Sequence, residues 1–145
     1  MSIDEKLLRN VTALFKHRAR PMKVPFFFGA LGGLDKDDPA EPTNVFLVDG
    51  DKIRREDDMD FVAGNNSEEQ PKFVKDLNGG DCGAIYIDDK TCPDEWIPNT
   101  YHEAKEYSLM CGGMKYEQAH ERANAEEKLI RLRRQNDEMD HPEEC

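Results

Sequence analysis

The stretch Thr100–Tyr107, which reads Thr-Tyr-His-Glu-Ala-Lys-Glu-Tyr, decides how this chain is interpreted. If residues 98–110 form a helix, His102 and Glu106 lie four residues apart and therefore on one face of it. Glu103 lies beside them, one step round the helix. A histidine and a carboxylate at this spacing can hold a metal ion, and the neighbouring Glu103 is free to take part in chemistry at that ion.

A metal ion held by these two side chains needs a third protein ligand, and His120 is the best-placed candidate. The connection Cys111–Met114 is short, so the next helix should return as an αα-hairpin and bring His120 towards His102 and Glu106. Two histidines and one carboxylate leave a fourth position for water, as in catalytic zinc sites. Zinc lowers the pKa of such a water to about 7. Glu103 would take the proton as general base, which predicts hydrolysis of a peptide or other amide bond.

Several nearby residues have more than one interpretation. Glu127 follows His120 by two helical turns and could be a fourth ligand, an acceptor that orients a histidine, or an ion-pair partner of Arg131. Tyr101 and Tyr116 could each stabilise an oxyanion or serve as core aromatics with a hydroxyl at the surface.

Two simpler or competing interpretations concern His102 and the cysteines. Glu is abundant in this chain, so a Glu can follow a His at this spacing by chance. In that case His102 is a packing residue and not a ligand. A metal site built from Cys92, Cys111 and His102 is a competing hypothesis, and a nucleophilic pair such as Cys82 with His120 is another. The four cysteines have no paired spacing, so reduced thiols are expected.

The composition excludes some partners. The 145 residues contain 20 Lys and Arg against 31 Asp and Glu, a net charge of −11. This charge repels phosphate backbones and anionic membrane surfaces, so we expect no direct nucleic-acid substrate and no membrane association. The basic segment Lys16–Lys23 and the apolar Val24–Leu34 together resemble a targeting signal. The apolar run contains Pro25 and is too short to span a membrane. We expect a cytoplasmic protein.

The hydrophobic pattern predicts an α+β fold with a small mixed or antiparallel sheet. We expect one domain over residues 1–136 and a disordered acidic tail over 137–145. Ser2 and Glu5 form a capping-box pattern before an N-terminal helix, and Asp49-Gly50 predicts a tight hairpin turn. The expected helices are Ile3–Arg18, 98–110 and 115–134. The expected strands are Lys23–Phe28, Asn44–Val48, Asp51–Arg55, Asp58–Val62 and Ala84–Ile87.

The remaining segments are expected to be loops or to support the helical hairpin. Asp35–Thr43 and Gly64–Pro71 are rich in Pro, Gly and acidic residues and are typical of loops. Ala84–Ile87 precedes the His102 helix, where an edge strand could hold a substrate peptide by strand addition. In the second helix the residues expected to face inward are Tyr116, Ala119, His120, Ala123, Glu127 and Ile130.

The chain from about residue 44 to 130 resembles uncharacterised proteins of phages and bacterial mobile elements that look like minimal zincin metallopeptidases. The resemblance is carried by Ile85–Asp89, His102-Glu103 with Glu106, Leu109-Met110, Gly113–Tyr116, Ala119-His120, Ala123 and Glu127. Upstream, Phe46–Gly50 and Asp58–Phe61 with Gly64-Asn65 are also similar to that group. It implies a zincin-like domain with a metal at His102, Glu106 and His120 and with Glu103 as base. A glutamate stands where zincins have their second histidine, and a carboxylate ligand also suits Mn²⁺ or Fe²⁺ beside Zn²⁺.

Three hypotheses follow. The first is a small zinc-dependent metallopeptidase whose substrate is a host or viral protein. The second is a non-catalytic acidic protein, encoded by a phage, that binds and inhibits a host protein, since an acidic surface can compete with nucleic acid for a basic partner. In the third the metal has a structural role and joins the two helices.

Overall fold

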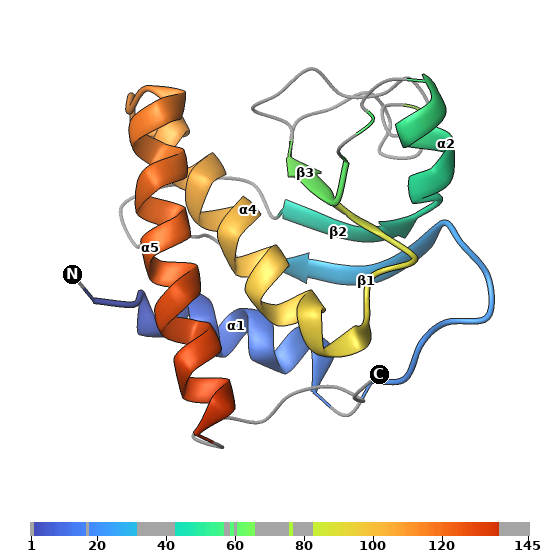
Figure 1. Ribbon diagram of the computed structural model, residues 1–145, viewed down its shortest axis with the longest axis horizontal. Helices are drawn as coiled ribbons and strands as arrows, with labels where there is room; N and C mark the ends of the chain where they lie inside the picture. Colours follow the sequence, from blue (N-terminus) through green and yellow to red (C-terminus); the bar gives the residue numbers. More distant parts are fainter. Residues whose placement is uncertain are drawn as a thin grey trace.

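The computed structural model describes residues 2–16, 18–31, 43–56, 59, 61–65, 76 and 83–136. These residues form an α+β fold in which helices pack against a small mixed sheet (Figure 1). The predicted tail 137–145 and most of the predicted loop Asp35–Thr43 lie outside the described residues. No described helix is both long enough and apolar enough to cross a membrane.

The sheet has four strands in the order β1-β2-β4-β3. They are β1 (Phe26–Leu31), β2 (Thr43–Val48), β3 (Ala63–Asn65) and β4 (Ala84–Asp88). β4 runs parallel to β2 and antiparallel to β3, so it is a central strand rather than the edge strand expected from the sequence. All five residues of β4 are buried. A continuous apolar run such as Ile85-Tyr86-Ile87 suits a strand covered on both faces.

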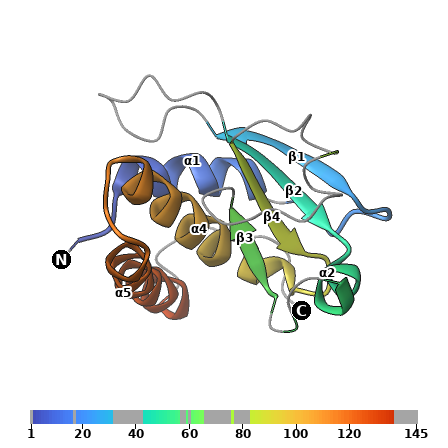
Figure 2. The same cartoon turned by 90° about the horizontal axis from the view of Figure 1, so that it is seen from above.

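Three of the helices form two layers on one face of the sheet (Figure 2). α1 (Glu5–Phe15) and α4 (Trp96–Cys111) lie against one face, and α5 (Tyr116–Gln135) packs along α4 on the side away from the strands (Figure 2). A short 3₁₀ turn, η1 (Pro93–Glu95), leads from β4 into α4. Helices α1, α4 and α5 confirm the three helices expected from the sequence, and each end differs by a few residues at most.

The prediction that Asp51–Arg55 forms the second strand of a hairpin is wrong. Residues Gly50–Glu56 form helix α2 instead. Asp49 accepts a hydrogen bond from the Lys52 amide at 3.2 Å, so the Asp-Gly pair starts a helix here. Strand β2 pairs with β4, which comes 36 residues or more later in the chain, and this distant partner takes the place of a local one.

Three other boundaries differ from the expectations. β1 begins three residues late and continues through Gly29, whose φ of +141° accompanies a bulge after Phe27. Met59, Phe61 and Val62 are not in a strand, whereas Asp58 and Asp60 of that expected strand lie outside the described residues. The strand in this region is Ala63–Asn65, and its Gly64 and Asn65 belong to the segment expected to be a loop. Helix α1 is capped by the Asp4 side chain, which accepts from the Leu7 amide at 3.1 Å, and not by Ser2.

The main core lies between the sheet and the first helical layer. Trp96 at the start of α4 is fully buried and its ring lies 5.0 Å from Phe28 and 5.7 Å from Phe15. A second, smaller cluster on the other face includes Phe61 stacked on Tyr86 at 5.6 Å. The sheet is therefore packed on both sides, and α4 is anchored to it by its first turn.

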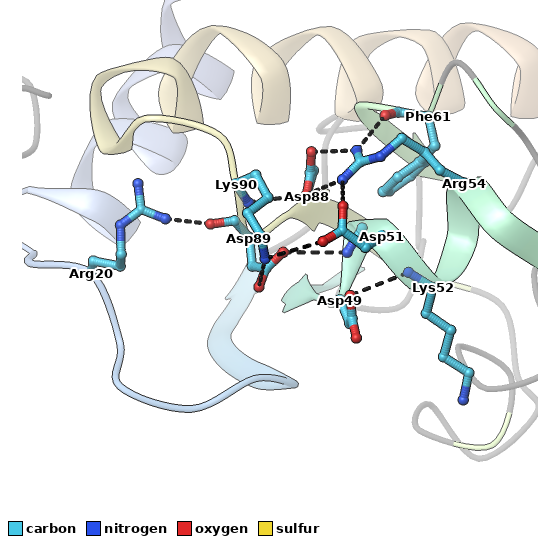
Figure 3. Close-up of polar contacts among 10 residues, drawn as sticks. Arg20, Asp49, Asp51, Lys52, Arg54, Phe61, Asp88, Asp89 and Lys90 are labelled. Atoms are coloured by element: carbon cyan, nitrogen blue, oxygen red, sulfur yellow. Dashed lines mark hydrogen bonds and ion pairs between the residues drawn. The ribbon is translucent and has the colours of Figure 1, made fainter.

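The carboxyl ends of the parallel strands β2 and β4 are joined by a polar network (Figure 3). Arg54 of α2 contacts the buried Asp88 at 2.6 Å and Asp51 at 2.6 Å, and it donates to the Phe61 carbonyl oxygen at 3.1 Å. These carboxylates keep the Arg54 pKa raised. The network fixes α2 and the segment before β3 to the end of β4.

We predict that Gly64→Ala destabilises the fold. A Cβ at residue 64 would lie 2.6 Å from the Tyr86 ring, and that ring is held by its stacking on Phe61. Overpacking of this kind costs about 1–3 kcal/mol. Gly112→Ala is the matched control, because its Cβ would lie 3.4 Å from the nearest atom. Urea unfolding of both variants tests this; equal midpoints would show that β3 does not lie close against Tyr86.

Candidate metal centre

Glu106 lies between two histidines that come from different helices. Its Oε2 is 3.1 Å from His102 Nε2 within α4 and 2.8 Å from His120 Nδ1 on α5. One nitrogen of each ring and one carboxylate oxygen lie within 4.8 Å of one another, and among the described residues this is the one such group of three or more His, Cys, Asp or Glu. The structure thus brings together the three ligands proposed from the sequence.

The helical hairpin that brings them together is built as the sequence predicted. α4 ends at Cys111 with Gly112 as its C-cap, and the following Gly113 has φ +101°, a conformation that residues with a side chain rarely adopt. The Met114 amide donates to the Leu109 carbonyl, which closes the turn, and α5 begins after Lys115. A connection this short forces the two helices to pack antiparallel, which places the first turns of α5 beside the last turns of α4.

Glu127 lies on the other side of His102. Its Oε1 is 2.9 Å from His102 Nδ1, in close ion contact rather than a well-aligned hydrogen bond. Its Oε2 accepts from Arg131 at 3.0 Å, and Arg131 also contacts Glu95 at 2.6 Å. Glu127 therefore lies against His102 and also pairs with Arg131. A carboxylate on the far nitrogen of a histidine ligand fixes the ring orientation and tautomer.

Glu103 is buried beside the cluster and is joined to it through Asn65 of β3. The Asn65 side-chain amide lies 3.4 Å from Glu103 Oε2 and 3.5 Å from Glu106 Oε1. Sequence reasoning did not assign Asn65 to the site, because it is separated from Glu103 by 38 residues. Its position in a segment expected to be a loop left no pattern that could reveal the contact.

The charges of the cluster depend on one another. Burial lowers the pKa of His102, but its contacts with Glu106 and Glu127 and the charge of Glu103 outweigh the burial and raise this pKa to about 10. Burial raises the pKa of Glu106, and the two histidines outweigh it and lower this pKa. Without a metal ion the group is thus a buried carboxylate neutralised by protonated imidazole.

The three side chains could hold a metal ion. Two ligand atoms of tetrahedral zinc, each about 2.0–2.1 Å from the metal, are roughly 3.3 Å apart. The 3.1 and 2.8 Å distances to Glu106 Oε2 need only a small outward movement to reach this spacing. The Glu106 side chain is 1% exposed and that of His120 is 42% exposed, so the group opens to solvent on the His120 side. Water or a substrate could approach from there.

The two flanking tyrosines occupy different places. The Tyr116 ring stacks on His120 at 5.3 Å and lies at the open side of the group. Tyr101 is fully buried, donates to Glu126 of α5 and accepts from the Asp4 amide, which makes it part of the helix interface and not of the site. The fully buried Glu126 had not been expected to face inward.

The cysteine model of the site is wrong. Cys92 is disulfide-bonded, which also differs from the expectation of reduced thiols. Cys111 is a free cysteine and is exposed at the end of α4. A disulfide sulfur offers no thiolate to a metal ion, so these residues and His102 do not form a ligand set.

No family model matches the chain, and no curated protein or solved structure shows significant similarity to it. What can be inferred about function therefore rests on the geometry of the residues themselves.

We predict that the metal-free protein becomes less stable as the pH rises from about 6.5 to about 10. His102 keeps its proton in the folded state to a pKa of about 10, against 6.5 for the unfolded reference. Its stabilising contribution is complete below pH 6.5 and is lost as the pH passes through the folded value, with a slope of at most about 1.4 kcal/mol per pH unit. Urea unfolding with a chelator present, at pH 6, 8 and 10, measures this loss.

His102→Gln is the control for that measurement, because it removes the titrating imidazole and leaves every other titratable group of the chain in place. The difference in slope between the parent and this variant isolates His102. The same pH dependence in both proteins would contradict the assignment of a protonated His102.

Proposed function

We propose that the protein is a metal-dependent hydrolase of the zincin-like kind, in which His102, Glu106 and His120 hold a zinc ion. The observation that carries this proposal is the convergence of two imidazole nitrogens on one oxygen of a buried glutamate. Two histidines and one carboxylate with an open side are the ligand set of catalytic rather than structural zinc. Mn²⁺ and Fe²⁺ are compatible with the same ligands.

The proposed division of labour follows from burial and contact. Zinc held in this way would lower the pKa of a coordinated water and polarise a substrate carbonyl. Glu103 is the general base, since its carboxylate shares the Asn65 amide with Glu106 but is not among the converging ligand atoms. Glu127 holds the His102 ring, and Arg131 holds Glu127. Each of these groups is in place before any substrate arrives.

A peptide is the substrate class that we favour. β3 is at the edge of the described sheet and Asn65, its last residue, contacts the proposed base. An extended peptide that adds to a sheet edge presents its backbone carbonyls at regular intervals along that edge. Strand addition of a peptide, which the sequence suggested for Ala84–Ile87, is thus proposed for β3 instead. A host or viral protein would supply such a segment.

The metal site is tested by elemental analysis of purified, untagged protein. We expect about one zinc per chain in the parent and its loss in His102→Ala, because that change removes a ligand and leaves Glu106 with one histidine. His141→Ala is the control, since it removes a histidine from the predicted tail. A parent that takes up no metal even after zinc is added would refute the proposal.

The reaction is tested by Glu103→Gln. We expect full zinc content and an unchanged fold, with hydrolysis reduced about 10²- to 10⁴-fold, because an amide cannot accept the proton that a general base takes. The probe is a mixture of denatured proteins, in which new peptide ends are counted by mass spectrometry. Glu127→Gln is the comparison, as it should affect zinc affinity more than proton transfer. Cleavage that survives Glu103→Gln would exclude Glu103 as the base.

The net charge of −11 favours a second candidate, the acidic protein that binds and inhibits a host protein. In that case the metal, if one binds, joins α4 to α5 and has no catalytic role. The two functions differ in a biological assay, because binding driven by charge would survive Glu103→Gln and weaken with added salt.

A further inference from the structure

Among the described residues of the sheet, Asn65 is the one polar residue whose side chain is fully buried and contacts α4. It pairs with Ile85 across β3 and β4, and its neighbour Gly64 lies so close to the Tyr86 ring that no Cβ would fit. The backbone of β3 is therefore fixed closely against β4. This packing determines where the Asn65 amide lies relative to the helix.

The Asn65 amide group lies near three oxygen atoms of α4. Its Nδ2 is 3.3 Å from the Glu103 carbonyl oxygen, 3.4 Å from Glu103 Oε2 and 3.5 Å from Glu106 Oε1. An amide nitrogen carries two hydrogens, so these three acceptors share two donors. The contact to Glu106 uses Oε1, whereas both histidines approach Oε2. The two oxygens of Glu106 thus have different partners.

This arrangement answers a physical difficulty of the site. Glu103 and Glu106 are 5% and 1% exposed, and two like charges held near one another away from water repel and lose hydration. A lysine or arginine between them would satisfy both oxygens but would form a strong ion pair with the base. A neutral amide donates hydrogen bonds to both carboxylates and adds no charge.

We propose that Asn65 is a positioning residue that assigns the two carboxylates their separate roles. By binding Glu106 Oε1 it orients Oε2 towards the histidines, and by binding the carbonyl and carboxylate of Glu103 it keeps the base beside the ligands. The inference rests on the proposed function, because the roles of ligand and base have meaning only if a metal binds there.

The test compares zinc binding by the full-length parent and Asn65→Leu, a variant of similar size without a donor. We expect the zinc affinity of the variant, measured by competition with a chromophoric chelator, to fall about 10- to 100-fold, as for other changes behind a metal ligand. We also expect the visible absorption of the Co²⁺-loaded protein to change, because Glu106 would no longer present the same oxygen. A purely structural role would lower stability without altering this spectrum.

Thr100→Val is the matched control. Thr100 is also fully buried on α4, two residues before His102, and its hydroxyl has no hydrogen-bond partner among the described residues. Removal of that hydroxyl should leave both the zinc affinity and the Co²⁺ spectrum unchanged. If Asn65→Leu does not fold, Asn65→Ser replaces it. Serine donates one hydrogen bond, so a smaller loss of affinity with an altered spectrum is expected.

The outcomes separate this inference from the function on which it rests. If the parent binds zinc and the folded Asn65 variant has the same zinc affinity and the same Co²⁺ spectrum, the role of Asn65 is overturned. The proposed metal site is not affected by that result. A parent that binds no zinc overturns both. Weaker zinc binding with an altered spectrum in the variant, and neither change in Thr100→Val, supports the positioning role.

Discussion

The structure depends on how a buried carboxylate is neutralised. Glu106 is 1% exposed, and an ionised carboxylate in such a place is costly unless several donors surround it. His102 supplies one donor from the same helix, His120 supplies another from α5, and Asn65 supplies a third from the sheet. Helix, hairpin and strand therefore meet at one side chain. A metal ion bound as proposed would take the place of the proton on His102, so the same geometry would serve the protein with and without the ion.

The interface between α4 and α5 contains a second buried acid, and the two are arranged reciprocally. Glu106 of α4 binds His120 of α5, whereas Glu126 of α5 accepts from Tyr101 of α4. Buried polar pairs of this kind contribute less to stability than apolar packing does, but they are satisfied in only one register of the two helices. A shift of α5 by one turn would take the donor His120 away from Glu106 and the donor Tyr101 away from Glu126. Two separate contacts therefore fix the register that brings His120 to Glu106.

The sequence was informative where contacts are local and silent where they are distant. The spacing of His102 and Glu106 and the short Gly112-Gly113 connection predicted the helical hairpin, because each pattern involves neighbours in the chain. Asp49-Gly50 failed as a hairpin signal, since the same pair can cap a helix and β2 found its partner in the remote β4. Asn65 was missed for the same reason: a lone asparagine in a polar stretch gives no sign of the helix that it contacts. The burial of Glu126 was likewise set by Tyr101 on another helix.

All three candidate ligands lie between residues 102 and 120, on the two arms of one helical hairpin. Closing a loop of this length costs little chain entropy, and the hairpin can bring the ligands together without any residue of the sheet. A metal ion could therefore bind during folding, before β3 has reached α4. The ion would then act as a folding nucleus that holds the hairpin while the strands assemble. In that order Asn65 would reach Glu103 and Glu106 last, after the proposed ligands of the hairpin had already met.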